Sequence, residues 1–208
     1  MNKNFSEATE LLYQGEDINK QFLDPEAPPL FLTSAFILGD LEQVDRTYKE
    51  KGYTYIRTRN PNRNMLGEAI SFLEKGKRTL ICSSGMAAIT TTYFSLFKNG
   101  DHIVANKNIY GETFDAITKL ISKFGVTATF VDFSDLDAVE KAMQDNTKMI
   151  YTEVASNPTD HLADIEALAK IAHAHGALMM VDNTFTTPFA IKPLTLGADI
   201  VISSMTKF

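Results

Sequence analysis

Short apolar runs and helix-spaced apolar positions alternate regularly between residues 79 and 202. The apolar runs predict strands at residues 79–82, 102–105, 126–131, 149–153, 177–181 and 200–202. Apolar residues three and four apart predict helices at residues 86–97, 113–124, 136–144 and 165–175. Strands alternating with helices of roughly 10–15 residues are typical of a mostly parallel sheet with helices on both faces. The expected fold class is therefore α/β.

The first 64 residues lack this alternation. Prolines at positions 25, 28 and 29 favour an extended arm over residues 1–30. A short strand is expected at residues 33–38, followed by a polar, basic loop at residues 52–64, in which Pro61 stops any helix. A helix is then expected at residues 65–75, so the chain divides into two parts, residues 1–64 and 65–208.

Composition excludes several classes of partner. The formal net charge is −6 and the pI is about 5.2, so there is no basic surplus for nucleic acid or an anionic membrane. No apolar stretch has the length of a membrane span, and the first residues lack the apolar core of a signal peptide. The single cysteine excludes an intramolecular disulfide framework, so we expect a cytoplasmic protein.

Polar residues that could bind a ligand or take part in catalysis follow several predicted strands. Ligands of open α/β sheets bind outside the carboxyl ends of the strands. Residues 83–85, 153, 182–183 and 204–207 occupy such positions, and Tyr110 lies in a loop that follows another strand. The four histidines do not form a ligand set, so no metal site is expected.

Lys207 comes just after a predicted buried strand, behind the hydroxyl residues Ser204 and Thr206. A buried lysine is costly, but the cost becomes useful when its amine must be an unprotonated nucleophile toward a carbonyl cofactor. The two hydroxyls could then donate to a phosphate. The alternative is a solvated lysine on a surface loop.

Each of the other candidates also has a plain structural alternative. Gly85 and Met86 at a helix start could offer backbone N–H groups to a phosphate, or Ser84 could simply cap that helix. Asp182 could pair with a pyridinium nitrogen or serve as a turn residue. Tyr110 could stack on a planar cofactor or be a half-buried loop tyrosine, and Glu153 and Asn157 could be ordinary turn residues.

Taken in order, these residues match a known family. The matching motifs are Tyr55-x-Arg57-x-x-Asn60-Pro61, Ser84-Gly85-Met86, Tyr110-Gly111-x-Thr113, Glu153-x-x-x-Asn157-Pro158, Asp182-Asn183-Thr184 and Ser204-x-Thr206-Lys207. Over residues 28–208 the set resembles the Cys/Met-metabolism family of pyridoxal phosphate enzymes. That family includes methionine γ-lyase, cystathionine γ-lyase and γ-synthase, and O-acetylhomoserine sulfhydrylase. The implied fold is the large domain of the aspartate aminotransferase-like (type I) enzymes.

The resemblance implies a role for each matching residue. Lys207 would hold the cofactor covalently and shuttle protons, Asp182 would pair with the ring nitrogen, and Tyr110 would stack on the ring. Gly85, Met86, Ser204 and Thr206 would bind the phosphate, with Asn157 as a further cofactor contact. Tyr55 and Arg57 would reach the phosphate in a neighbouring subunit's site. Lys207, Tyr110 and Tyr55 are the catalytic candidates.

The implied reaction is carbon–sulfur chemistry on a sulfur amino acid, with γ-elimination as in methionine γ-lyase expected first. The alternatives are γ-replacement, as in a sulfhydrylase or cystathionine γ-synthase, and an inactive fragment. Many methionine γ-lyases carry cysteine where this chain has Glu112, which argues against strict methionine specificity.

The resemblance also sets the expected organisation. Residues 1–64 would be an N-terminal arm and inter-subunit loop, and residues 65–208 an apparently truncated cofactor-binding domain. By this resemblance, we expect the smaller C-terminal domain of the family to be absent from this chain. We expect a homodimer or homotetramer whose active sites are shared between subunits.

Overall fold

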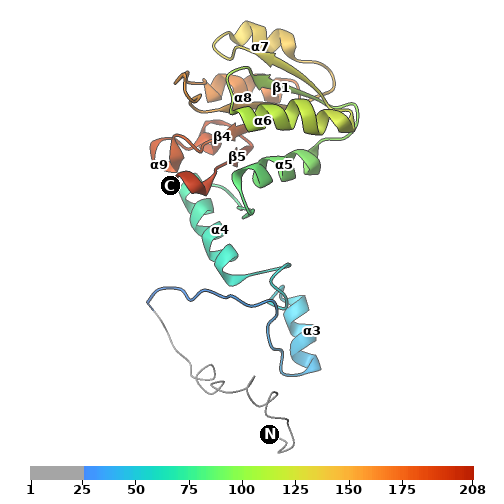
Figure 1. The fold of residues 1–208 in the computed structure, drawn as a ribbon, viewed down its shortest axis with the longest axis vertical. Coiled ribbons are helices and arrows are strands. Elements are labelled where there is room, and N and C mark those ends of the chain that lie inside the picture. The colour runs from blue at the N-terminus through green and yellow to red at the C-terminus, as the bar shows by residue number, and fades with distance from the viewer. Residues whose placement is uncertain (1–25) are drawn as a thin grey trace, which may run out of the picture. The chain divides into compact units, whose positions relative to one another are not determined.

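The computed structural model describes residues 26–208 (Figure 1). The chain forms two compact units that divide between Asn62 and Arg63. The part of the predicted arm at residues 1–25, including Pro25, lies outside the described residues.

A five-stranded parallel sheet forms the centre of the 63–208 unit. Its strands are β1 His102–Asn106, β2 Thr127–Val131, β3 Thr147–Glu153, β4 Leu178–Asp182 and β5 Ile200–Ile202. They lie in the order β2-β1-β3-β4-β5, and every neighbouring pair is parallel. The expected α/β class is confirmed, with five of the six expected strands.

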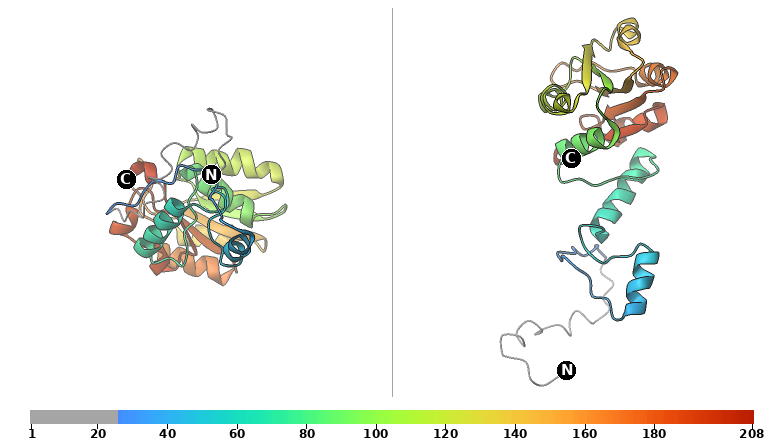
Figure 2. Two further views of the ribbon diagram at one scale, coloured as in Figure 1. Left: turned by 90° about the horizontal axis from the view of Figure 1, so that it is seen from below. Right: turned by 90° about the vertical axis from the view of Figure 1, so that its right-hand side faces the viewer.

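Helices cover both faces of this sheet (Figures 1 and 2). Along each strand, alternate side chains enter opposite cores, as the pleat requires. Val104 and Ile150 belong to one core, which also holds residues of α7 Leu136–Ala142 and α8 Ile165–Ala174. Ile103 and Tyr151 belong to the other, which holds residues of α5 Gly85–Leu96 and of the helical segment that follows residue 111.

That helical segment changes type along its length. Helix α6 covers Gly111–Asp115, a π-helix follows at Ala116–Leu120, and a 3-10 helix at Ile121–Phe124 ends it. The expected helix at residues 113–124 therefore exists, and it begins two residues earlier. Three further short helices lie near the end of the chain: α9 Thr187–Ala190, a 3-10 turn at Pro193–Leu196 and another at Met205–Lys207.

The strand order reverses direction between β1 and β3. From β1 the chain goes to β2 on one side, whereas from β3 it goes to β4 on the other side. The loops that leave these two strands therefore diverge, and an open crevice outside their carboxyl ends is where doubly wound sheets bind ligands. The segments that follow Asn106 and Glu153 flank this point.

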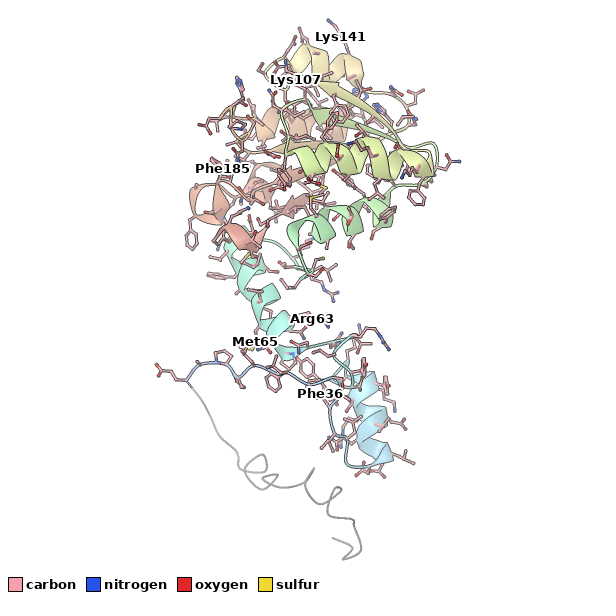
Figure 3. The ribbon with its side chains drawn as sticks, viewed as in Figure 1. Phe36, Arg63, Met65, Lys107, Lys141 and Phe185 are labelled. Carbon is pink, nitrogen blue, oxygen red and sulfur yellow. The ribbon has the colours of Figure 1, made fainter. Side chains whose placement is uncertain are left out.

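Three expectations about local structure were wrong. Residues 79–82 form no strand, because they pair with no neighbouring strand in the described chain; Leu80 is exposed. Residues 33–38 form only an isolated antiparallel bridge, between Ala35 and Tyr55. Pro61 does not stop a helix but begins α4 Pro61–Glu74, since proline has no N–H to satisfy at the first helical position. Helix α4 thus starts one turn before Met65, which Figure 3 labels.

The 26–62 unit contains helix α3 Leu41–Lys49, capped by the Asp40 carboxylate, which accepts a hydrogen bond from the Gln43 backbone at 2.7 Å. The expected elements did not include this helix, although Leu41, Val44 and Tyr48 have helical spacing along it; none of its residues is buried. Phe36 packs near Phe31 and Tyr53, with ring centroids 6.3 Å and 5.7 Å apart (Figure 3). Among residues 26–208, no helix has both the length and the apolar character needed to span a membrane.

Candidate active site

Two carboxyl groups lie side by side where β3 and β4 end. Glu153 and Asp182 are register partners on these neighbouring strands, which in parallel sheets lie about 4.8 Å apart. Their strands place both on the face covered by α5 and α6, because Tyr151 and Met180, two residues earlier, belong to that core. The backbone continues the pairing, with the Val154 N–H donating to the Asp182 carbonyl at 3.1 Å.

Both carboxyl groups hold their protons more tightly than usual. Burial raises the pKa of Glu153 to about 7, and the nearby Asp182 adds to the rise, while hydrogen bonds from backbone N–H groups of Tyr110 and Asn157 oppose it. Burial also raises the pKa of Asp182, against the lowering effect of its hydrogen bonds with Thr184 and Tyr151. This pair is therefore poised to receive a cationic partner, which would favour ionisation.

Tyr110 is held at the edge of this pair through its backbone. Its N–H donates to the Glu153 Oε1 at 2.5 Å, and the residue forms the N-cap of α6. The residue is 54% exposed. Asn157, four residues after Glu153, is exposed and precedes a cis peptide bond to Pro158.

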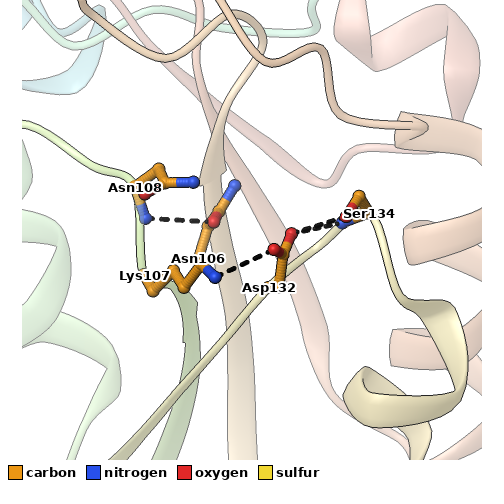
Figure 4. Close-up of polar contacts among 5 residues, drawn as sticks. All are labelled: Asn106, Lys107, Asn108, Asp132 and Ser134. Atoms are coloured by element: carbon orange, nitrogen blue, oxygen red, sulfur yellow. Dashed lines mark hydrogen bonds and ion pairs between the residues drawn. The ribbon is translucent and has the colours of Figure 1, made fainter. Parts of the chain in front are cut away.

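Polar contacts at the ends of β1 and β2 support the segment that leads to Tyr110 (Figure 4). The Asn106 side chain accepts from the Asn108 backbone at 3.1 Å, and Lys107 pairs with Asp132 at 2.9 Å. Asp132 also accepts from the Ser134 backbone and hydroxyl at 3.0 and 2.7 Å. Hydrogen bonding to Lys107 and Ser134 lowers the pKa of Asp132 below its usual range. Because the ion pair is exposed, its role is to order the turn rather than to add much stability.

Small residues and hydroxyls meet at the start of α5. A Cβ on Gly85 would lie 2.7 Å from Ser204 Cβ, so only glycine permits this approach. The Ser204 and Thr206 hydroxyls are 2.9 Å apart, and the Ser204 backbone donates to the Thr184 hydroxyl at 2.8 Å. The Oγ of Ser203 is buried and has no hydrogen-bond partner among the described residues. These donors beside a helix N-terminus suit a phosphate group.

Both plain alternatives for this region also find support. Ser84 does cap α5, since its hydroxyl accepts a hydrogen bond from the Ala87 backbone N–H at 3.0 Å. This cap does not use the donor groups around Gly85 and Ser204. Lys207 ends the 3-10 turn Met205–Lys207 and is exposed, so the sequence argument that it must be desolvated is not met in this structure. Met86 is half-buried and packs against the core beneath α5.

Tyr55 and Arg57 belong to the 26–62 unit. The Arg57 guanidinium carbon lies 4.8 Å from the centroid of the Tyr55 ring, a cation–π contact. Tyr55 is partly exposed, and its backbone bridges to Ala35. The contact holds the two predicted phosphate-binding residues together as a pair.

Sequence reasoning missed a buried group of hydroxyls behind the carboxyl pair. The hydroxyls of Tyr93, Thr113 and Tyr151 are buried, and that of Tyr151 interacts with Asp182 and with Thr113. Burial, together with the nearby Asp182, raises the pKa of both tyrosines well above 10. The signal that could have identified Tyr151 is its spacing of two from Glu153, which places both on one face of β3.

The described residues contain no group of three or more His, Cys, Asp or Glu side chains that could hold a metal ion. The donor set instead has three parts: a carboxyl group that could pair with a ring nitrogen, an exposed tyrosine, and hydroxyl and backbone groups that could donate to a phosphate. A lysine follows one of those hydroxyls directly in sequence. Together with a parallel α/β sheet, this set defines the class of enzyme that uses pyridoxal phosphate, and its residues fit that cofactor.

Comparison with known proteins gives the family. Residues 8–208 match the family model described as Cys/Met metabolism PLP-dependent enzyme, and the chain belongs to this family. It is 45% identical over 185 residues to the L-methionine gamma-lyase of Fusobacterium nucleatum subsp. polymorphum, covering 88% of this chain and 47% of that protein.

Two further comparisons show how broad the similarity is. The cystathionine gamma-synthase/O-acetylhomoserine (thiol)-lyase of Bacillus subtilis is 46% identical over 180 residues, covering 86% of this chain and 46% of that protein. A crystal structure of a putative O-acetylhomoserine (thiol)-lyase from Campylobacter jejuni superposes with a TM-score of 0.80 at 33% identity, covering 86% of this chain and 45% of that one. That structure contains a pyridoxyl-lysine 5′-monophosphate. The chain spans about half the length of the curated relatives that it matches.

Proposed function

We propose that the full-length protein is a pyridoxal phosphate-dependent carbon–sulfur lyase that performs γ-elimination on a sulfur amino acid. The observation that carries this proposal is the partly buried carboxyl group of Asp182 at the end of β4. It pairs in register with Ile202 of β5, and the chain then continues to the hydroxyls of Ser204 and Thr206 beside Gly85. A carboxyl group shielded from water is the partner that a protonated ring nitrogen requires, because the positive charge of that nitrogen would lower the carboxyl pKa and favour the ionised form.

Each residue has a defined task in this proposal. Lys207 bonds covalently to the cofactor, Asp182 pairs with its ring nitrogen, and the exposed ring of Tyr110 covers its face. Phosphate oxygens accept hydrogen bonds from the backbone N–H groups of Gly85 and Met86 and from the hydroxyls of Ser204 and Thr206. Asn157, at the opposite loop, contacts the cofactor.

The bound cofactor supplies an electron sink for the charge left when a proton leaves the substrate α-carbon. The protein's own work is to place groups and to move protons. With substrate bound, Lys207 Nζ would accept the α-proton and carry protons between carbons. Asp182 stays ionised opposite the ring nitrogen, and Tyr110 holds the reacting plane in place.

γ-Replacement is the second candidate, because the synthase/thiol-lyase relative is as similar to this chain as the γ-lyase relative. Glu112, at the start of α6 and exposed, also stands where many methionine γ-lyases carry cysteine. A product assay separates the two reactions. Release of 2-oxobutanoate and a thiol from methionine or cystathionine without an added acceptor supports the lyase, whereas turnover only with an acceptor thiol supports replacement.

We also propose a homodimer or homotetramer in which Tyr55 and Arg57 of one subunit serve the phosphate of the next. An arginine fork donates two parallel hydrogen bonds to a phosphate, and the Tyr55 ring holds that fork in place. A cytoplasmic location is consistent with the single cysteine. The 208-residue chain alone would then be an inactive fragment if the substrate carboxylate is bound elsewhere in the full-length protein, and a comparison of its turnover with that of the full-length protein tests this.

A further inference from the structure

Glu153 lies where the topology of the sheet reverses, and the cofactor contacts proposed above give it no task. It ends β3, next to β1 on one side and β4 on the other. The loop after β1 leads to Tyr110, and the loop after β3 leads to Asn157. A side chain at this position can therefore hold both loops.

The contacts of Glu153 match that position. Its residue surface is only 9% exposed, and its Oε1 accepts the Tyr110 N–H at 2.5 Å, across 43 positions of sequence. The backbone N–H of Asn157 also hydrogen-bonds to this carboxyl group. One buried side chain thus contacts the backbone of the residue that starts α6 and of the residue that precedes Pro158.

The charges around Glu153 indicate that its carboxyl group acts as a hydrogen-bond acceptor rather than through a negative charge. Asp182 is its neighbour in the sheet, and no cationic side chain is among the groups that act on it. Two carboxylates so close, both shielded from water, oppose each other's ionisation. A neutral carboxyl group still has a carbonyl oxygen that accepts an N–H.

We propose that Glu153 is a positioning residue that fixes the Tyr110 ring over the cofactor, by accepting the Tyr110 backbone N–H as a neutral or ionised acceptor. The inference rests on the proposed function, because it assumes that Tyr110 covers pyridoxal phosphate. It predicts that an amide can replace the carboxyl group, whereas removal of the acceptor cannot be tolerated.

The first test needs no cofactor. Hydrogen exchange followed by mass spectrometry is measured on the cofactor-free full-length protein and on Glu153→Gln, Glu153→Ala and the exposed control Glu166→Ala. Exchange in peptides covering residues 107–114 should accelerate in Glu153→Ala alone. Unchanged protection there in Glu153→Ala would overturn the positioning contact, whether or not the protein binds pyridoxal phosphate.

The second test asks whether Glu153 acts through the ring of Tyr110. Affinity for pyridoxal phosphate is measured by titration for the wild type, Glu153→Gln, Glu153→Ala, Tyr110→Ala and the double variant Glu153→Ala/Tyr110→Ala. Loss of the acceptor should weaken binding about tenfold, and glutamine should keep it within about twofold of the wild type. In the Tyr110→Ala background, Glu153→Ala should have no further effect.

The outcomes separate this inference from the proposed function. Equal weakening by Glu153→Ala in both backgrounds would mean a merely structural role and would overturn the inference while leaving the cofactor assignment intact. A loss with Glu153→Gln as large as with Glu153→Ala would also overturn it, since the charge and not the acceptor would then matter. A wild-type full-length protein that binds no pyridoxal phosphate would overturn the proposed function and the cofactor role of Glu153 together.

Discussion

Gly85 is the residue whose size matters most to the proposed phosphate site. A methyl group there would lie 2.7 Å from Ser204 Cβ and 2.9 Å from its Oγ, closer than real atoms approach. Either α5 or the Ser204 segment would have to move, and both carry phosphate donors. The position is thus set by a contact between residues 119 positions apart, which no local pattern reveals.

We expect Gly85→Ala to weaken pyridoxal phosphate binding about tenfold or more, because a shift of a few tenths of an ångström lengthens several hydrogen bonds at once. The measurement is a cofactor titration of the full-length protein. The matched control is Gly111→Ala, where an added Cβ meets nothing within 4 Å at the start of another helix. Equal affinity in the two variants would refute the close-approach argument.

The protonation of Glu153 should affect how the free energy of unfolding depends on pH. Its pKa is raised from an ordinary 4.5 to about 7 in the folded protein, chiefly by burial. Between these values the folded state keeps a proton that the unfolded state has lost, so the group's contribution is full below pH 4.5 and falls as pH rises to 7. The fall amounts to at most about 3 kcal/mol and stops above pH 7.

Glu153→Gln, which cannot ionise, should remove this part of the pH dependence. The free energy of unfolding in urea, measured at several pH values from 5 to 8, should therefore favour the variant more and more as pH rises. The difference between wild type and variant isolates Glu153 from other titrating groups. A difference that is constant across this range would show that Glu153 titrates normally.

At the scale of elements, capping residues determine where the helices begin. Asp135 and Asp164 each accept from a backbone N–H three residues on, at 3.0 Å, and start α7 and α8. Helix α8 then buries Ile165, Leu168, Ala169 and Ala172 against the sheet. Loss of the cap at the start of α8 should therefore also weaken the packing of this helix against the sheet.

We expect Asp164→Ala to lower the free energy of unfolding by about 1 kcal/mol, since it removes both a cap and a negative charge near the helix N-terminus. Asp164→Asn should keep most of the stability, because asparagine caps as well as aspartate does. Chemical denaturation of the three proteins at pH 7 measures this. Equal losses in both variants would assign the effect to charge alone.

At the scale of the whole molecule, the proposal that active sites are shared between subunits can be tested by mixing two inactive variants. Arg57→Ala and Lys207→Ala variants of the full-length protein should each be nearly inactive. Refolded together, about half of the dimers should be mixed, each with one intact site of two, so about a quarter of wild-type activity should return. Either variant refolded alone is the control. No recovery on mixing would mean that each site is built from one chain.

The pattern of apolar and polar residues along the sequence determined most of the secondary structure of this protein. The spacing of apolar residues predicts which segments are helices and which are strands. A buried strand or helix face repeats its apolar side chains at a fixed spacing within one short segment. This pattern therefore predicted the five strands and the main helices of the 63–208 unit, and the polar residues at strand ends. It failed at residues 79–82, where a β-branched apolar run has no strand to pair with.

Tertiary structure decided the relations between distant residues. The strand order put Glu153 beside Asp182 and the segment after β1 beside Glu153, and the packing of α5 brought Gly85 against Ser204. It also decided that Tyr93, Thr113 and Tyr151 bury hydroxyls behind the carboxyl pair, and that Lys207 is exposed. Contacts across tens of residues, and the pKa changes that burial causes, depend on which surfaces meet, and a local period carries no information about that choice.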